Sequence, residues 1–329
     1  MNNSPVSMIL GTGAAVPEKV VTNFELEKIV DTTDKWIRER SGIERRHILE
    51  DGKMNSDLAS IAAQRALEDA GVEAKDLDYI ICGTVTPDML FPSNACSVQA
   101  KIGATNAAAF DISAACSGFL YGLSIADTLL RDSNTKRVLV LGSEMLTRIT
   151  DWEDRSTCVL FGDGSGAAVL GPSDGKKGIM STYMKSDGRL GHLLYMPGGG
   201  SANPASHETV DQRMHYVKMA GREVFKHAVK AMADAAIHGL SLAGFEDEDI
   251  DLLIPHQANI RIIDAIAKRL KLPKEKVYIN IQEYGNTSAA SIPIAMDEAR
   301  KKGILHEGSR CLLVAFGGGF TWGSTMIQF

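Results

Sequence analysis

An internal duplication is the feature that most restricts how this chain can fold. Residues 70–78 (AGVEAKDLD) recur as residues 243–251 (AGFEDEDID), 173 positions later, and an apolar stretch follows both copies. Further along, residues 116–127 pair with residues 286–297 at an offset of 170. A long-range repeat of this kind means that one structural unit occurs twice. We therefore expect two similar halves that share a core about a pseudo-twofold axis.

Each half is an alternation of strands and helices. Short apolar runs such as 79–82 are separated by helical stretches such as 57–70 and 258–270. This alternation is typical of α/β proteins, and it predicts mostly parallel sheets covered by helices, with one sheet in each half.

The boundary between the halves is expected near residues 171–178, where glycines, a proline and charged side chains indicate a turn or linker. We place the N-terminal half at 1–174 and the C-terminal half at 175–329. The N-terminal half would carry a nucleophilic cysteine, and the C-terminal half a histidine and an asparagine.

Composition excludes several classes of protein. The 329 residues contain no apolar run long enough for a membrane span and no signal peptide at the start, so we expect a cytoplasmic protein that does not bind membranes. A net charge of −6 argues against general nucleic-acid binding. The five cysteines form no CxxC pair or zinc-ligand spacing, which predicts free thiols, no metal site and no cofactor.

Cys116 is the first candidate for chemistry. It lies in a run of small residues, 113–118, between an extended segment at 108–112 and an apolar helical pattern from Phe119 to about Leu130. A thiol at the first turn of a helix lies at the positive end of the helix dipole, which favours the thiolate. The pattern indicates a nucleophile, although hydrolase, transferase and inert core thiol all stay open.

Three further elements accompany Cys116. His256 follows an apolar strand at the edge where α/β folds gather catalytic groups, Asn286 occupies the place of Cys116 in the second copy, and glycines fill 317–319. Each has a structural alternative, namely a core histidine, a helix N-cap and a tight turn. Together they suggest that Asn286 faces Cys116 and that glycine N–H groups form an oxyanion hole.

The motifs at 114–119, 255–259, 285–290 and 316–323 resemble, in this order, those of β-ketoacyl-acyl carrier protein synthase III, a family of the thiolase superfamily. The resemblance extends over nearly the whole chain. It implies a homodimer with a duplicated, five-layered α-β-α-β-α fold that contains two mixed sheets. It also implies the reaction that initiates type II fatty-acid synthesis, in which an acyl-CoA primer, expected to be acetyl-CoA, condenses with malonyl-acyl carrier protein.

The resemblance assigns roles to the catalytic candidates. Cys116 would take the acyl group from the primer and release CoA, as a covalent nucleophile does in a two-stage reaction. His256 and Asn286 would bind the malonyl thioester carbonyl and stabilise the enolate left when carbon dioxide departs. The N–H groups of Cys116 and Gly318 would form the oxyanion hole.

The resemblance also predicts the substrate-binding surfaces. Trp36 and Arg155 would hold the CoA adenine, and Phe91 would cross a dimer interface to close the partner's acyl pocket. The other expected contacts are Thr32 and Arg40 to CoA, Asn259 to the pantetheine arm and Phe316 to the acyl group.

Carrier-protein docking is expected on a basic surface. The helical stretch after His256 has an apolar face and a net basic face, which suits an acidic carrier protein despite the overall negative charge. The expected docking residues are Arg222, Lys226, Gln257, Arg261, Lys268 and Arg269.

Other functions compete with this interpretation. A degradative or biosynthetic thiolase would need a second cysteine near the C-terminus, and a two-histidine condensing enzyme would have histidine where Asn286 stands. Related enzymes of quinolone, polyketide or olefin synthesis share the same constellation. A cysteine thioesterase or a non-catalytic CoA-binding protein fits less well, because the Cys/Asn pair suggests no water-activating arrangement.

Overall fold

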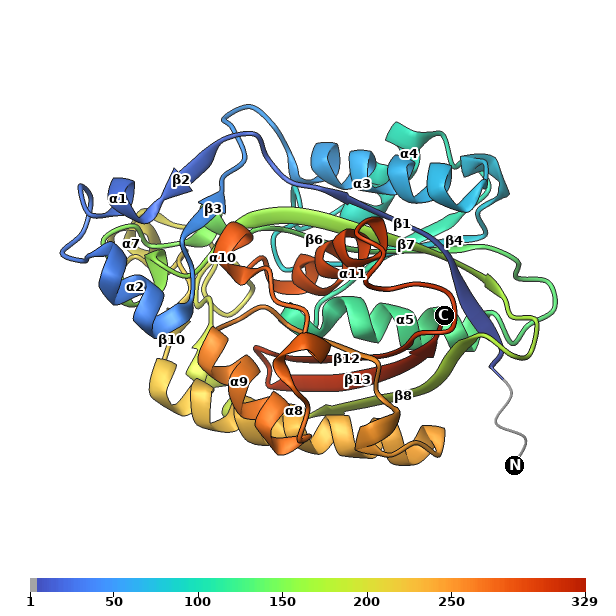
Figure 1. Cartoon of the computed structure of the whole chain (residues 1–329). Helices are drawn as coiled ribbons and strands as arrows, with labels where there is room; N and C mark the ends of the chain where they lie inside the picture. Colours follow the sequence, from blue (N-terminus) through green and yellow to red (C-terminus); the bar gives the residue numbers. More distant parts are fainter. Residues whose placement is uncertain (1–4) are drawn as a thin grey trace.

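The computed structural model describes residues 5–329, and its helices and strands stack as five layers (Figure 1). Helices α3 (Asn55–Ala70) and α4 (Asn94–Ile102) cover the outer face of the first sheet. Helices α5 (Gly118–Leu129) and α11 (Ser291–Lys301) lie between the two sheets, and α8 (Gly221–Ala243) covers the outer face of the second. The α-β-α-β-α order implied by the family resemblance is confirmed.

The first sheet has five strands in the order β1-β7-β6-β4-β5. Strand β4 is parallel to β5 and β6, whereas β7 is antiparallel to both β6 and β1. The bounds are β1 Ser7–Ala15, β4 Tyr79–Gly83, β5 Ala108–Ile112, β6 Val138–Met145 and β7 Asp163–Pro172.

The second sheet has four strands in the order β11-β12-β13-β8, of which only β11 and β12 are parallel. The bounds are β8 Gly178–Ser186, β11 Leu252–Pro255, β12 Arg310–Gly317 and β13 Thr321–Gln328. The expectation of mostly parallel sheets is therefore wrong and the sheets are mixed. The physical reason is that β12 returns directly into β13 through residues 318–320, and so short a connection can join only antiparallel strands.

Smaller elements surround these layers. They are β2 Val20–Thr22, α1 Asn23–Leu26, α2 Asp34–Ser41, β3 Arg45–His47, α6 Arg155–Cys158, β9 Leu194–Tyr195, α7 His207–Asp211, β10 Lys218–Met219, α9 Ile260–Arg269 and α10 Ile281–Tyr284. The 3₁₀ helices are η1 Ala74–Asp76, η2 Ala115–Ser117, η3 Leu146–Ile149, η4 Gly188–Leu193, η5 Asp247–Asp249, η6 Lys274–Lys276 and η7 Ser288–Ala290. No helix within residues 5–329 is both long and apolar enough to cross a bilayer.

Close backbone packing holds the outer helix on the first sheet. A Cβ atom added to Gly11 or Gly13 of β1 would come within 2.4 Å of backbone atoms of α3. Glycine is therefore required where β1 passes under the helix. Between the sheets, the core contains apolar residues from both halves, including Val140, Leu313 and Leu120.

The duplication is confirmed, and its offset is uniform. The Asp78 carboxylate accepts a hydrogen bond from the Arg137 N–H at 2.9 Å, and Asp251 accepts from the Arg310 N–H at 2.9 Å, so this contact repeats after 173 residues. The turns before the central helices α5 and α11 repeat with the same offset.

Two left-handed residues mark these turns. Ala115 has φ of 45° at the start of η2, and Ser288, 173 positions later, has φ of 50° at the start of η7. The structural counterpart of Cys116 is therefore Ala289, and the expected pairing of Cys116 with Asn286 is wrong by three residues. The offset of 170 pairs similar runs of small side chains, and such runs do not show where the left-handed residue of each turn lies.

Candidate active site

Cys116 lies in the turn between β5 and α5, where backbone segments approach closely. A Cβ atom on Gly83 of β4 would be 2.6 Å from the Gly118 carbonyl carbon. The absence of a side chain at Gly83 thus lets the helix start directly against the strand end. Cys116 lines two adjacent cavities, one on the side of His256 and one on the side of Gly318.

The environment of Cys116 favours the thiol. Burial raises the pKa of Cys116 to about 12, and the Ser288 hydroxyl acts in the opposite direction by stabilising the thiolate. The expectation of a thiolate favoured by the helix start is therefore wrong for the free protein. Cys116 must lose a proton when it reacts.

His256 follows β11 directly and is 2% exposed. Its Nδ1 lies 2.7 Å from the Ser291 hydroxyl, which also accepts the Gln257 N–H at 3.4 Å. The Ser291 hydroxyl can therefore donate to Nδ1, which leaves Nε2 as an N–H donor. Burial lowers the pKa of His256 to about 3, so the ring is neutral at physiological pH.

Asn286 lies in the same cavity as Cys116 and His256. Its Oδ1 accepts the Ser288 N–H at 2.9 Å, and its own N–H donates to the Leu160 carbonyl at 2.8 Å. The side chain thus closes a turn ahead of η7, but it is not the helix N-cap that the structural alternative predicted, because Thr287 and Ala290 are the N-cap residues of η7 and α11. This turn uses only the oxygen, and within residues 5–329 the amide NH₂ group has no acceptor, so it can donate to a ligand.

The glycines after β12 pack against the nucleophile. A Cβ atom on Gly317 would be 2.6 Å from the Cys116 backbone nitrogen, and Gly318 lines the cavity beyond Cys116. Within residues 5–329, neither the Cys116 N–H nor the Gly318 N–H donates to a protein oxygen. Both groups are therefore available for an oxyanion, and the oxyanion hole itself stays a prediction.

Three cavities that share walls connect the surface to Cys116. The outer one is lined by Trp36, Arg40, Asn259 and Arg261, and it shares Asn259 with the cavity that contains His256. The third cavity, of about 360 Å³, lies beyond Cys116 and has mainly apolar walls. An extended ligand could thus place a polar end at the mouth and an acyl end in the third cavity.

The predicted CoA contacts gather at the mouth. The Arg155 guanidinium lies 5.1 Å and that of Arg40 6.0 Å from the centre of the Trp36 ring. Asn259 donates to the Arg40 carbonyl at 2.9 Å and caps α9 by accepting the Arg261 N–H at 2.9 Å. The buried Thr32 hydroxyl has no hydrogen-bond partner within the described part of the chain.

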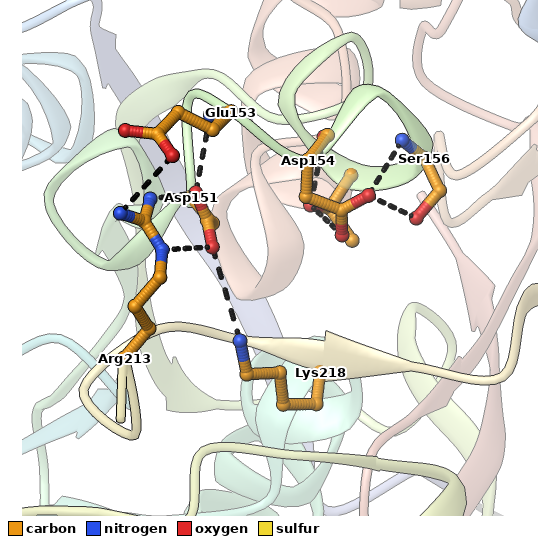
Figure 2. Close-up of polar contacts among 7 residues, drawn as sticks. Asp151, Glu153, Asp154, Ser156, Arg213 and Lys218 are labelled. Atoms are coloured by element: carbon orange, nitrogen blue, oxygen red, sulfur yellow. Dashed lines mark hydrogen bonds and ion pairs between the residues drawn. The ribbon is translucent and has the colours of Figure 1, made fainter. Parts of the chain in front are cut away.

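A polar cluster joins Arg213 and Lys218 to the segment that precedes Arg155 (Figure 2). Asp151 binds Arg213 through both carboxylate oxygens, and the ammonium group of Lys218 lies 3.8 Å away. Asp154 accepts the Ser156 N–H at 2.9 Å and caps α6, the helix that begins with Arg155. The polar, glycine-rich stretch before Lys218 is thus tied through Arg213 to the segment that carries Arg155.

The predicted docking residues divide into two groups. Arg222, Lys226, Arg261, Lys268 and Arg269 are exposed on α8 and α9. Gln257 is only 1% exposed, and its amide donates to the carbonyls of Pro255 and Tyr278. Its assignment to a docking surface is therefore wrong, because the side chain fixes the loop from inside.

The two phenylalanines differ in position. Phe91 is 85% exposed and lines none of the three cavities around Cys116 and the mouth. Phe316 is buried and lines the cavity that contains His256 and Asn286, so it lies on the opposite side of Cys116 from the apolar cavity.

Comparison with known proteins gives a family. Residues 110–188 match the family described as 3-oxoacyl-acyl-carrier-protein (ACP) synthase III, and residues 240–329 match its C-terminal family. The β-ketoacyl-acyl-carrier-protein synthase III of Caldanaerobacter subterraneus is 57% identical over 98% of this chain and 97% of its own. The chain belongs to the β-ketoacyl-acyl carrier protein synthase III family.

Solved structures agree with this assignment. Synthase III from Aquifex aeolicus is 48% identical, with a TM-score of 0.91 over 98% of this chain and all of its own. The priming β-ketosynthase of the R1128 polyketide pathway is 34% identical and also has a TM-score of 0.91. The protein is therefore a thiolase-fold acyltransferase, and it catalyses the condensation that initiates fatty-acid synthesis.

Three residues at the site of this synthase III were not among the predicted ones. Ser291 contacts His256, Ser288 contacts Asn286, and the buried Glu144 contacts Ser288. A carboxylate in the otherwise uncharged strand β6 was the available signal for Glu144. The repeat at an offset of 173 would have indicated Ser288, because it matches Ala115 next to the nucleophile.

Proposed function

We propose that Cys116, His256 and Asn286 perform the two stages of this condensation in one cavity. The observation that supports this proposal is that all three line the cavity between the surface mouth and the apolar space beyond Cys116. In the first stage the Cys116 sulfur attacks the carbonyl carbon of the primer thioester, the bond from that carbon to the CoA sulfur breaks, and the acyl group stays on Cys116. The N–H groups of Cys116 and Gly318 bind the oxyanion.

The second stage needs hydrogen-bond donors at the malonyl thioester. A neutral His256 with Nε2–H and the Asn286 amide supply two donors that do not have to be deprotonated first. Loss of carbon dioxide leaves an enolate, and no base has to remove a proton from carbon. The enolate carbon attacks the acyl-cysteine and releases 3-oxoacyl-acyl carrier protein.

The mouth is proposed to bind CoA. Trp36, Arg40 and Arg155 present an aromatic face and two guanidinium groups, which suit a purine and phosphates. Thr32 lies four positions before Trp36, and its buried hydroxyl has no hydrogen-bond partner among residues 5–329. Asn259 lies where the outer cavity meets the inner one, which suits a pantetheine arm.

We expect acetyl-CoA as the primer and a homodimer as the working form. Phe91 is exposed and lines none of the three cavities in its own chain, and it would close the acyl cavity of a second subunit. This closure would shorten the cavity of about 360 Å³ beyond Cys116. We also expect the protein in the cytoplasm, where these substrates occur.

Malonyl-acyl carrier protein is proposed to dock on the basic residues that α8 and α9 expose beside the mouth, because an acidic carrier is attracted to such a surface. Arg261→Glu should weaken the apparent affinity at low salt, and the effect should shrink as salt is added. Lys136→Glu, at the far end of β6, is the matched control. Equal affinities for Arg261→Glu and the wild type would exclude the surface.

Labelled acetyl-CoA and malonyl-acyl carrier protein test the catalytic roles. Cys116→Ala should take up no label, whereas His256→Ala and Asn286→Ala should be acylated and lose malonyl decarboxylation. Loss of one donor of this type typically costs about 10²–10³ in rate. Wild-type decarboxylation by either variant would refute the assignment, and hydrolysis without condensation would indicate a thioesterase.

A further inference from the structure

Glu144 is a buried carboxylate that the condensation as described does not use. It is 0% exposed near the end of β6, and within residues 5–329 no Lys or Arg nitrogen lies within 4.0 Å of it. A buried carboxylate is costly unless it is bonded or protonated. Its position directly behind the reactive turn raises the question of what the carboxylate does.

Hydrogen bonds divide the two oxygens of Glu144 into separate roles. Oε2 accepts from the Thr86 hydroxyl at 2.5 Å, the Val85 N–H at 3.1 Å and the Thr84 hydroxyl at 3.3 Å. Oε1 accepts only from the Ser288 hydroxyl, at 3.0 Å. Oε2 is thus held by three donors, and Oε1 is the oxygen that is free to take a proton.

Ser288 connects Glu144 to the nucleophile. Its hydroxyl donates to Glu144, and Ser288 and Cys116 line the same cavity. The hydroxyl oxygen has lone pairs that can accept the Cys116 proton. The Ser288 N–H binds Asn286, so the backbone of the relay residue is also held in place.

Acylation needs an acceptor for the Cys116 proton, and His256 is a poor one. Its Nδ1 is engaged by Ser291, and burial lowers its pKa to about 3. Burial instead raises the pKa of Glu144 to about 7, so its carboxylate can gain and lose a proton near neutral pH. The charge of Glu144 in turn raises the pKa of two titratable groups near it, the thiols of Cys116 and Cys82.

Resting on the proposed role of Cys116, we propose that Glu144 receives the Cys116 proton through Ser288 during acylation and returns it when the acyl group leaves. The thiol proton moves to the Ser288 oxygen, while the original Ser288 proton moves to Oε1 of Glu144. The Ser288 hydroxyl then points at the sulfur that attacks the thioester. In the second stage the same shifts run backwards and restore the Cys116 thiol.

This relay balances the reaction. The CoA thiolate released in the first stage takes one proton from water. Decarboxylation and carbon–carbon bond formation neither add nor remove a proton. One proton is therefore consumed per turnover. The overall reaction requires this, since acyl-CoA and the malonyl thioester give CoA thiol, carbon dioxide and the 3-oxoacyl thioester.

The test is rapid-quench acylation of Cys116 by labelled acetyl-CoA across a pH series. Glu144→Gln keeps the size and most hydrogen bonds but cannot take the proton, and it should slow acylation by about 100-fold or more at neutral pH. The wild-type rate should rise with pH through neutrality, whereas the rise in the variant should move to alkaline pH with the thiol itself. A purely structural role would not move this profile.

Two further variants complete the test. Asp163→Asn replaces another buried carboxylate bonded to a threonine, Thr147, and should leave the acylation profile unchanged. Ser288→Ala removes the middle member of the relay and keeps Glu144 as the residue at position 144. It should therefore reproduce the slow, alkaline-shifted profile even where Glu144→Gln fails to fold. Wild-type rate and profile in Ser288→Ala, or in folded Glu144→Gln, would overturn the relay alone. Equal labelling of wild type and Cys116→Ala would overturn the proposed function as well.

Discussion

The neutral state of His256 leads to a prediction about stability in acid. Its ordinary pKa of 6.5 falls to about 3 in the folded protein because the ring is buried. Below pH 6.5 the unfolded chain binds a proton that the folded protein refuses. The contribution of neutral His256 to the free energy of unfolding is therefore complete above pH 6.5, and it is lost as the pH falls towards 3. At 1.36 kcal/mol per pH unit, the loss between pH 7 and pH 4 is about 3 kcal/mol.

His256→Gln isolates this effect, since glutamine is polar and does not titrate. We expect the free energy of unfolding, measured by urea denaturation, to fall by about 3 kcal/mol more in the wild type than in the variant between pH 7 and pH 4. Carboxylates such as Glu144 titrate in both proteins, so their contributions cancel in the difference. Parallel curves for the two proteins over this range would refute the reasoning, because they would mean that folded His256 protonates normally.

Two further changes test the geometry around the nucleophile. Gly317→Ala should slow acylation of Cys116 by about 100-fold, because the new methyl group would lie 2.6 Å from the Cys116 nitrogen. Rapid-quench acylation measures this rate. Gly188→Ala is the control and should be acylated normally, because its Cβ would meet no atom within 4 Å. Arg213→Ala should reduce discrimination between short and long acyl-CoA primers by up to about tenfold, because it frees the polar, glycine-rich stretch before Lys218 from Asp151; kcat/KM across a chain-length series measures this, and an unchanged series would exclude this effect.

The positions of the nucleophile and the histidine could be predicted because each depends on a short stretch of sequence. His256 follows β11 directly and Cys116 lies in the turn after β5, and motifs of a few residues locate such positions. The family resemblance then supplied Gly318, whose N–H is free beside the cavity. A short stretch of sequence records a turn well.

Contacts between distant segments were not visible in the same way. Glu144 and Ser288 are 144 residues apart, and only the packing of the two halves brings them within 3.0 Å. Gln257 was misassigned for a related reason, since neighbours in a loop can point in opposite directions. His256 faces the cavity, whereas Gln257 binds carbonyl groups inside the protein.

The glycine packing at the two central turns makes the halves interdependent. Gly317, from the second half, leaves room for Cys116 of the first, and Gly142, from the first half, leaves room for Ala289 of the second, where a Cβ atom would lie 2.1 Å from the carbonyl oxygen. Each half therefore shapes the reactive turn of the other. Separate fragments of this chain would each carry part of the chemistry, and neither would carry the geometry of its own reactive turn.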